Sequence, residues 1–340
     1  MPRFILIVIL LVFLSSCSST QKITVSEIEK LYFDYDPSQN LNFGNAMTGT
    51  FKARMIDGKV HDITSNRKFT YTTNDFLTTS ISNNFQIVKR PNSFADSVIT
   101  ILMTYQDKDE TFQIEQNVGM NYKGDLMVVL DGKNGENGVD QKDRGTKLIG
   151  RNGKDGDNGT NGENGESSGS YEAYIWRSED TIFIHVKDLN STAYWQFKSI
   201  GGQAITFDIS GGDGGKGGNG GDGGDGKDGK QSSDSSTDPG DGGKGGNGGN
   251  GGNGGNGGSI RVFIHPNAHK LQPNISYMLA GGKAGQAGAA GKGGAPGKAL
   301  SGQQPGDNGT NGTPGISGLS GTSGAYPIVS VSEFDPSTLY

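Results

Sequence analysis

The chain has 340 residues, and 59 of them are glycine, against a usual share of about 7%. Its formal charge is −6, and acidic and basic residues are interleaved without a basic block. Proteins that bind nucleic acid gather Lys and Arg on one surface, so this composition argues against a nucleic-acid partner. Hydrophobic residues concentrate at Ile28–Leu130 and in short runs after Ser170, which limits the second part of the chain to a small sheet.

The N-terminus has the pattern of an export signal. Arg3 supplies a positive charge, and Phe4–Leu14 is an apolar run too short to span a bilayer. Small residues then precede Cys17 in the order Leu-Ser-Ser-Cys. This segment resembles the lipobox of bacterial lipoproteins. The alternative is a plain secretory signal with a chance cysteine.

The lipobox resemblance implies that the chain is cleaved before Cys17 and that Cys17 carries lipid. Residues 1–16 are then a signal peptide and residues 17–23 a tether. The membrane becomes a partner through that lipid, and we expect the bacterial outer membrane, with the face undetermined. Because Cys17 is the only cysteine, no disulfide, catalytic thiol or thiolate metal site is expected.

Residues 24–124 are predicted to be an all-β domain. Apolar residues alternate with polar ones at Phe51–Met55 and at Ile99–Tyr105, and turn residues recur between such runs. The passages FKARMIDGKVHDIT and SVITILMTYQDK resemble the rhythm of bacterial Ig-like domains. That resemblance implies a β-sandwich that serves as a spacer or adhesive module without catalysis.

Residues 125–340 are predicted to form a β-sheet region from which three glycine-rich excursions leave and return. They cover residues 132–165, 211–258 and 281–324. Each is bracketed by two strand-like runs, which favours one sheet whose connections have become long hairpins. The expected strands are Asp125–Leu130, Tyr171–Trp176, Thr181–Lys187, Tyr194–Phe197, Ala204–Ile209, Ile260–His265, Ile275–Leu279 and Tyr326–Val331.

Within the excursions glycine recurs every third residue, which matches an extended left-handed helix with three residues per turn. The triplets are interrupted at Val139–Ile149, Gln231–Pro239 and Ala299–Pro305, the predicted tips. Six arms of about 17 residues at about 3.1 Å per residue would each extend roughly 50 Å. Candidate contact residues near the tips are Arg144, Gln231, Asp234, Asp238, Gln303 and Gln304.

The arms differ in how many bare faces they have. At Gly211–Asp225 and Gly242–Ser259 the unit is Gly-Gly-x, so these arms should contact neighbours on two sides. At Gly150–Gly165 and Gly306–Gly324 it is Gly-x-y, so these arms should lie at an edge. Gly281–Gly297 is mixed.

The triplets resemble bacterial collagen-like and glycine-rich surface proteins and polyglycine II bundles. The resemblance implies arms packed as one polyglycine or polyproline II bundle. Two alternatives stay open, a collagen triple helix and plain disorder, since Gly, Ser, Asp and Asn also make flexible linkers. Pro, which collagen favours, is nearly absent from the triplets, with Pro296 and Pro314 as exceptions.

Patterns for catalysis or cofactor binding are not found. The three-residue period lacks the apolar position of a calcium β-roll, and no Gly-Lys pair is followed by Ser or Thr. No histidine pair has metal-ligand spacing, and His185 is expected on the solvent face of its strand. Trp176 and Trp195 suit buried sheet anchors better than a sugar-stacking platform. We therefore expect no cofactor and no metal.

The sequence thus predicts a lipid-anchored protein of the bacterial envelope with a structural or adhesive display role, and not an enzyme. The alternative is a module that binds an envelope polysaccharide or protein through the β region or the Asp/Asn-lined arms. Candidate partners are accordingly the membrane and an envelope or surface polymer or protein.

Overall fold

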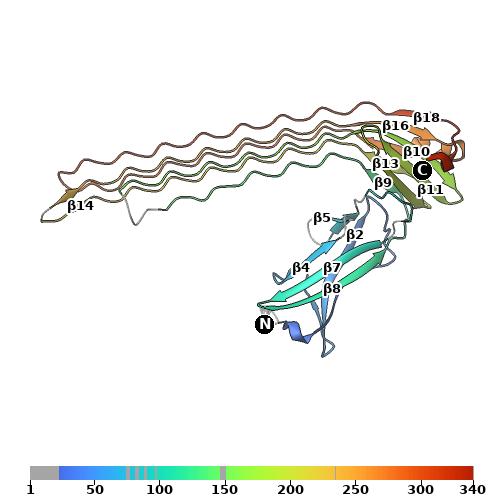
Figure 1. Cartoon of the computed structure of the whole chain (residues 1–340), viewed down its shortest axis with the longest axis horizontal. Coiled ribbons are helices and arrows are strands. Elements are labelled where there is room, and N and C mark those ends of the chain that lie inside the picture. The colour runs from blue at the N-terminus through green and yellow to red at the C-terminus, as the bar shows by residue number, and fades with distance from the viewer. Residues whose placement is uncertain are drawn as a thin grey trace, which may run out of the picture. The chain divides into compact units, whose positions relative to one another are not determined.

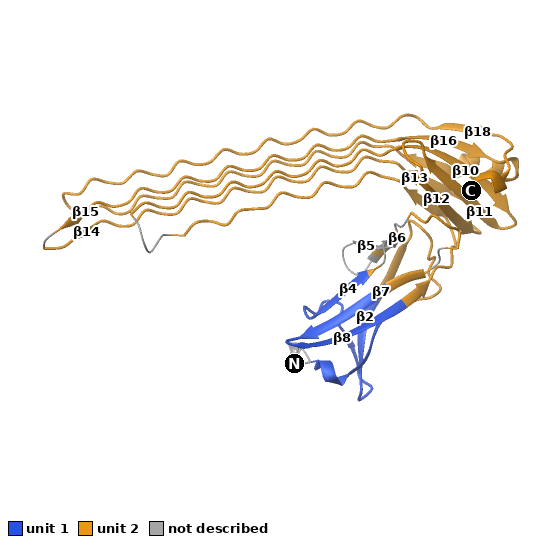
Figure 2. Cartoon of the chain, viewed as in Figure 1, with its two compact units in different colours: residues 1–34, 50–72, 101–116 blue, residues 35–49, 73–100, 117–340 orange. Residues whose placement is uncertain are grey.

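The computed structural model describes residues 23–73, 77–80, 84–87, 90–95, 98–145, 151–233 and 235–339. The chain divides into two compact units (Figure 2). The described parts of 1–34, 50–72 and 101–116 form unit 1, and those of 35–49, 73–100 and 117–340 form unit 2. The described residues are mostly strands and extended segments, so the all-β prediction is confirmed at that level.

The strands before residue 120 form two sheets. One has the order β1-β2-β6-β5 with β3 paired to β2, and the other has the order β4-β7-β8. Their bounds are Ile28–Tyr35 (β1), Ala46–Met55 (β2), Val60–Asp62 (β3), Phe69–Thr73 (β4), Leu77–Ser80 (β5), Asn84–Ile87 (β6), Val98–Asp107 (β7) and Glu110–Gly119 (β8).

Alternation along these strands places every second side chain in the core. In β7, Ile99, Ile101, Met103 and Tyr105 are buried while the residues between them are more exposed. In unit 1, the ring of Phe51 lies 5.0 Å from that of Phe33 and 4.6 Å from that of Tyr71. The first contact joins the neighbouring strands β1 and β2, and the second joins β2 to β4 of the other sheet, so aromatic side chains on the inward positions of the period-two pattern connect the two sheets.

Apart from the two-stranded sheet of β14 (Lys230–Gln231) and β15 (Ser236–Thr237), the strands after residue 120 form two further sheets in unit 2. One is a parallel sheet in the order β17-β13-β9, and the other has the order β12-β11-β10-β16-β18, in which β10, β16 and β18 are mutually parallel. The bounds are Leu126–Val129 (β9), Ser170–Ser178 (β10), Thr181–Asp188 (β11), Tyr194–Ile200 (β12), Ile205–Asp208 (β13), Ser259–Ile264 (β16), Ile275–Met278 (β17) and Ile328–Val331 (β18).

The expected strands lie within a few residues of the observed ones, but the expectation of one sheet is wrong. The strand that leaves for an excursion and the strand that receives it belong to different sheets. The three leaving strands share one direction, so they pair in parallel with one another, and three returning strands do the same. Local sequence patterns predict where each strand lies, but they do not predict which other strand it pairs with.

Short 3-10 helices complete the described residues: Val25–Glu27 (η1), Pro266–Asn274 (η2) and Pro336–Leu339 (η3). None of the helices in the described part of the chain has the length and apolar character needed to cross a membrane.

Candidate functional site

The candidate site is the set of six glycine-rich arms and their tips, all within unit 2. We number the arms in chain order: 132–145, 151–168, 211–229, 240–258, 281–298 and 306–324. Arms 1, 3 and 5 continue from β9, β13 and β17, while arms 2, 4 and 6 lead into β10, β16 and β18 (Figure 1). The sheets therefore set the order and direction of the arms.

Main-chain hydrogen bonds join the arms into two layers. In the outgoing layer, arms 1, 3 and 5 are bonded in parallel: the Gly214 N–H donates to the Lys283 carbonyl at 2.8 Å. In the returning layer, arms 2, 4 and 6 are bonded in the same way. Antiparallel bonds connect the layers, as when the Gly249 N–H of arm 4 donates to the Gly218 carbonyl of arm 3 at 2.8 Å.

Arms 3 and 4, which have the Gly-Gly-x unit, lie at the centre. Each is hydrogen-bonded to four other arms, whereas arms 1 and 6 are each bonded to two. This arrangement agrees with the prediction from the number of bare faces. The approach is close: a Cβ added at Gly215 would lie 2.5 Å from the carbonyl carbon of Glu136 in arm 1. A residue larger than glycine therefore does not fit there without moving a neighbouring backbone.

Asn and Asp side chains complete the hydrogen bonding of the arms. In a central Gly-Gly-x triplet the first N–H donates within the layer and the second donates to the other layer. The third N–H donates to an Asn or Asp Oδ1 of the adjacent parallel arm. Thus the Asn250 N–H donates to Asn161 Oδ1 at 2.8 Å, and Asn250 Oδ1 accepts from the Ile316 N–H at 2.9 Å. We call each such row across a layer an amide ladder.

The ladders use the acidic and amide side chains that the sequence offered as a candidate ligand surface. In the outgoing layer, Asp213 Oδ1 accepts the Lys283 N–H at 2.6 Å, and Asp222 Oδ1 accepts the Lys292 N–H at 2.6 Å. This role was missed from the sequence. Its signal is present, however, because Asn and Asp recur at one position of successive triplets.

The open edges of the arms carry features that limit further backbone pairing. Both prolines of the triplets, Pro296 and Pro314, lie in edge arms, where the missing N–H removes a donor. Side chains of arm 6 also cover donors of arm 5: Asn311 Oδ1 accepts the Gly293 N–H at 2.9 Å.

The second and third tips are bound to each other. Gln231 lies in the two-residue strand β14 (Lys230–Gln231), which pairs with β15 (Ser236–Thr237). Gln303 of the third tip places Nε2 2.9 Å from the Thr237 carbonyl and 3.0 Å from the Lys230 carbonyl. Gln303 therefore holds the conformation of the neighbouring tip.

The other candidate tip residues also make contacts within unit 2. The Gln304 N–H donates to Asp238 Oδ1 at 3.4 Å, and Arg144 forms an ion pair with Asp157. Asp234 lies outside the described residues.

The first tip begins later than predicted. The segment from Val139 is still part of arm 1, because the Gln141 N–H donates to Asn219 and the Arg144 N–H to Asp222, each bond being 2.9 Å long. Gln141 and Arg144 fit at these donor positions because arm 1 is an edge arm with fewer neighbours than a central one. Glycine spacing alone therefore ends this arm too early.

The expectation that His185 faces solvent is wrong. His185 is fully buried in β11, its ring stacks on Tyr194 of β12 at 5.3 Å, and Tyr174 of β10 lies at 6.5 Å. Burial lowers the pKa of His185 from 6.5 to about 4, and the charge of Lys187 acts in the same direction. Aromatic side chains of β10 and β12 cover the face of β11 that carries His185. The alternation of apolar and polar residues within β11 gives no information about these neighbouring side chains.

The two tryptophans pack into the β region of unit 2. Trp176 is buried and stacks on Phe183 at 5.6 Å, as expected for a sheet anchor. Trp195 is half-buried, with the Arg90 guanidinium 5.5 Å from its ring centroid.

Neither the arrangement of possible metal ligands nor similarity to known proteins assigns a function to the chain. Within the described ranges, no three His, Cys, Asp or Glu side chains gather as metal ligands would. Cys17 and the proposed signal lie outside the described residues. Neither a family model nor a curated protein nor a solved structure matches the chain.

Proposed function

We propose that this chain is a lipid-anchored bacterial envelope protein with a structural or adhesive display role and no catalysis. The observation that carries the proposal is the hydrogen bonding of the central arms, in which all three N–H groups of a triplet have partners. A segment bonded in this way resists bending, so its tips are held at a fixed distance of roughly 50 Å from the sheets. Holding a small loop surface away from an anchor is what a display protein requires.

We infer further that the arms form a polyglycine II-type bundle and that the first strands form an Ig-like sandwich. The three-residue repeat and the parallel and antiparallel bonds between arms support the bundle. Two sheets with an apolar, aromatic core before residue 120 support the sandwich. The Leu-Ser-Ser-Cys sequence ending at Cys17 supports the lipid anchor and an outer-membrane location.

The anchor is tested by metabolic labelling of cells with a fatty acid analogue. We expect the label on the wild-type chain and its loss in Cys17→Ala, with the protein released from the membrane fraction. A Ser18→Ala variant serves as the control and should keep the label. Label that persists in Cys17→Ala contradicts the anchor.

The display role is tested by cell adhesion to surfaces and to neighbouring cells. Deletion of residues 231–239 and 299–305 removes the second and third tips while leaving the glycine triplets in place. We expect adhesion to fall to the level of cells without the protein. Lys216→Ala, on the side of a central arm, should leave adhesion unchanged. Full adhesion after the deletion refutes tip display, and retained glycan binding would favour the alternative of a polysaccharide-binding module.

A further inference from the structure

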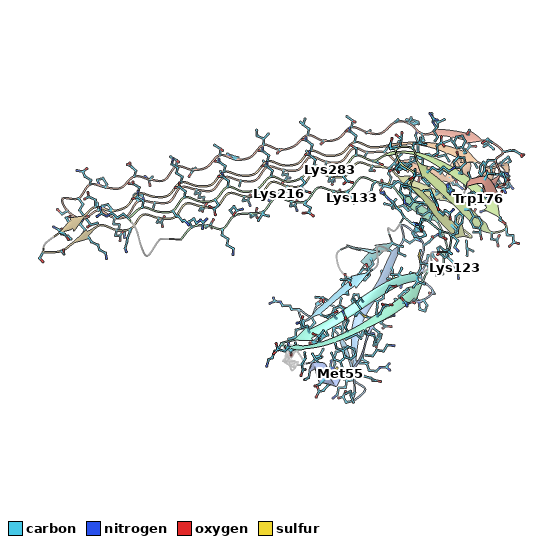
Figure 3. The ribbon with its side chains drawn as sticks, viewed as in Figure 1. Met55, Lys123, Lys133, Trp176, Lys216 and Lys283 are labelled. Atoms are coloured by element: carbon cyan, nitrogen blue, oxygen red, sulfur yellow. The ribbon has the colours of Figure 1, made fainter. Side chains whose placement is uncertain are left out.

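The outer faces of the two layers differ in charge. In the outgoing layer the ladder positions carry acidic residues such as Asp213 and Asp222 together with lysines such as Lys216 and Lys283 (Figure 3). In the returning layer, the four ladders that run through Asn247–Asn256 contain only Asn, Ser, Thr, Ile and Leu. We call these four ladders, across arms 2, 4 and 6, the amide face.

The amide face combines exposed apolar groups with fixed polar ones. Ile316 and Leu319 of arm 6 are 74% and 75% exposed. Their N–H groups donate to Asn250 and Asn253 Oδ1 at 2.9 and 2.8 Å, which fixes both the backbone and the amides. Each such Asn keeps its Nδ2 hydrogens as donors. A partner that binds here orders few groups, which lowers the entropy cost of association.

We propose that the amide face binds the same face of a second copy of this chain. Two copies with a formal charge of −6 repel each other, and this face is where they approach without charged ladder residues. An amide both donates and accepts, so a surface of amides is complementary to itself, as a two-fold interface requires. Contact also removes Ile316 and Leu319 from water.

The edges of the amide face select the relative direction of the two copies. Arm 2, at one edge, carries exposed Glu163 and Glu166, while arm 6, at the other, carries Ser317 and Ser320. A two-fold axis along the arms places arm 2 of one copy over arm 6 of the other. An axis across the arms would instead bring the glutamates of both copies together. The parallel arrangement therefore avoids like-charge contacts.

The area of the amide face determines how strongly two copies are expected to bind each other. Four ladders three residues apart extend about 28 Å at 3.1 Å per residue, and three arms are roughly 15 Å wide at the spacing of hydrogen-bonded chains. The two copies together then bury about 850 Å², which is the size of a weak, transient interface. We expect a dimer with a dissociation constant in the micromolar range, which crowding on a membrane favours.

The proposal is tested by light scattering and sedimentation of the full lipidated chain in detergent over a concentration series. The test variant is Asn250→Asp with Asn253→Asp. Asp keeps the Oδ1 acceptor, as Asp222 does for the Lys292 N–H, so the ladder is preserved. The matched control is Asn219→Asp, since Asn219 is also central and accepts the Ala289 N–H at 2.8 Å on the opposite face.

We expect the wild-type chain and Asn219→Asp to dimerise alike. The double variant should weaken dimerisation at least about tenfold, because it places four carboxylates close to the two-fold axis. Circular dichroism checks that all three chains keep the same fold. A wild-type chain that stays monomeric overturns the proposal, as does a control that weakens dimerisation as much as the double variant. Binding of a neutral glucan to a monomeric wild-type chain would assign the face to a polymer instead.

Discussion

A single methyl group in a central arm should destabilise the arms. In Gly249→Ala, the added Cβ would lie 2.5 Å from the carbonyl carbon of Thr160 in arm 2. The Thr160 carbonyl oxygen is closer still, and ordinary van der Waals contact begins at 3.4 Å, so arms 2 and 4 must separate locally by more than about 0.9 Å. The neighbouring atom belongs to backbone, so no side-chain rotation relieves the overlap.

The cost follows from the hydrogen bonds that this separation breaks. The Gly159 and Gly162 N–H groups donate to the Asn247 and Asn250 carbonyls at 2.8 Å, and the Asn250 N–H donates to Asn161 Oδ1 at 2.8 Å. Lengthening by 0.9 Å takes all three beyond hydrogen-bonding distance. At about 1 kcal/mol each they sum to about 3 kcal/mol. Alanine also lowers the conformational entropy of the unfolded chain, which offsets up to about 1 kcal/mol of this loss. The expected net decrease in the free energy of unfolding is therefore about 2 kcal/mol.

The assay is thermal unfolding followed by circular dichroism, with hydrogen exchange of the arm amides. We expect a lower melting temperature, by roughly 5 °C, and faster exchange in arms 2 and 4. The matched control is Gly145→Ala, because a Cβ at Gly145 has no atom within 4 Å. If both variants unfold at the same temperature and exchange alike, close backbone contact does not hold the arms together.

Three further predictions test the ladder, the buried histidine and the tip. Asn250→Ala removes the acceptor of the Ile316 N–H, so hydrogen exchange at Ile316 should rise about fivefold for a loss of about 1 kcal/mol, while Asn250→Asp should leave it unchanged. His185 has a lowered pKa, so the unfolded chain takes up its proton first as the pH falls. Above pH 6.5 His185 is neutral in both the folded and the unfolded chain. Between pH 6.5 and about 4 only the unfolded chain binds the proton, so the free energy of unfolding falls by about 3 kcal/mol. A His185→Gln variant should lack that pH dependence of the denaturation midpoint. Gln303→Ala should increase proteolysis of the second tip, whose carbonyls Gln303 binds, and Gln304→Ala should leave it unchanged, because Gln304 bonds Asp238 through its backbone N–H.

Much of the arm arrangement could be predicted because glycine spacing acts through excluded volume. A residue without Cβ allows a backbone to approach, so Gly-Gly-x at Gly211–Asp225 has two contact sides and Gly-x-y at Gly306–Gly324 has fewer. The prediction was less accurate for arm 1, because an arm at the edge has fewer neighbouring backbones and can carry residues larger than glycine at these positions. Gln141 and Arg144 take donor positions without being glycine, and the first arm is longer than its glycines indicate.

The sequence by itself determined the strands, the three-residue repeat and the difference between central and edge arms, because each depends on the shape of nearby residues. Only the tertiary structure decided that leaving and returning strands form separate sheets, because pairing depends on segments far apart in the chain. The same long-range pairing brings Tyr174 and Tyr194 around His185 and sets Asn161 beside Asn250. A side chain's own triplet or strand gives its direction, but its environment is supplied by chains that arrive from elsewhere.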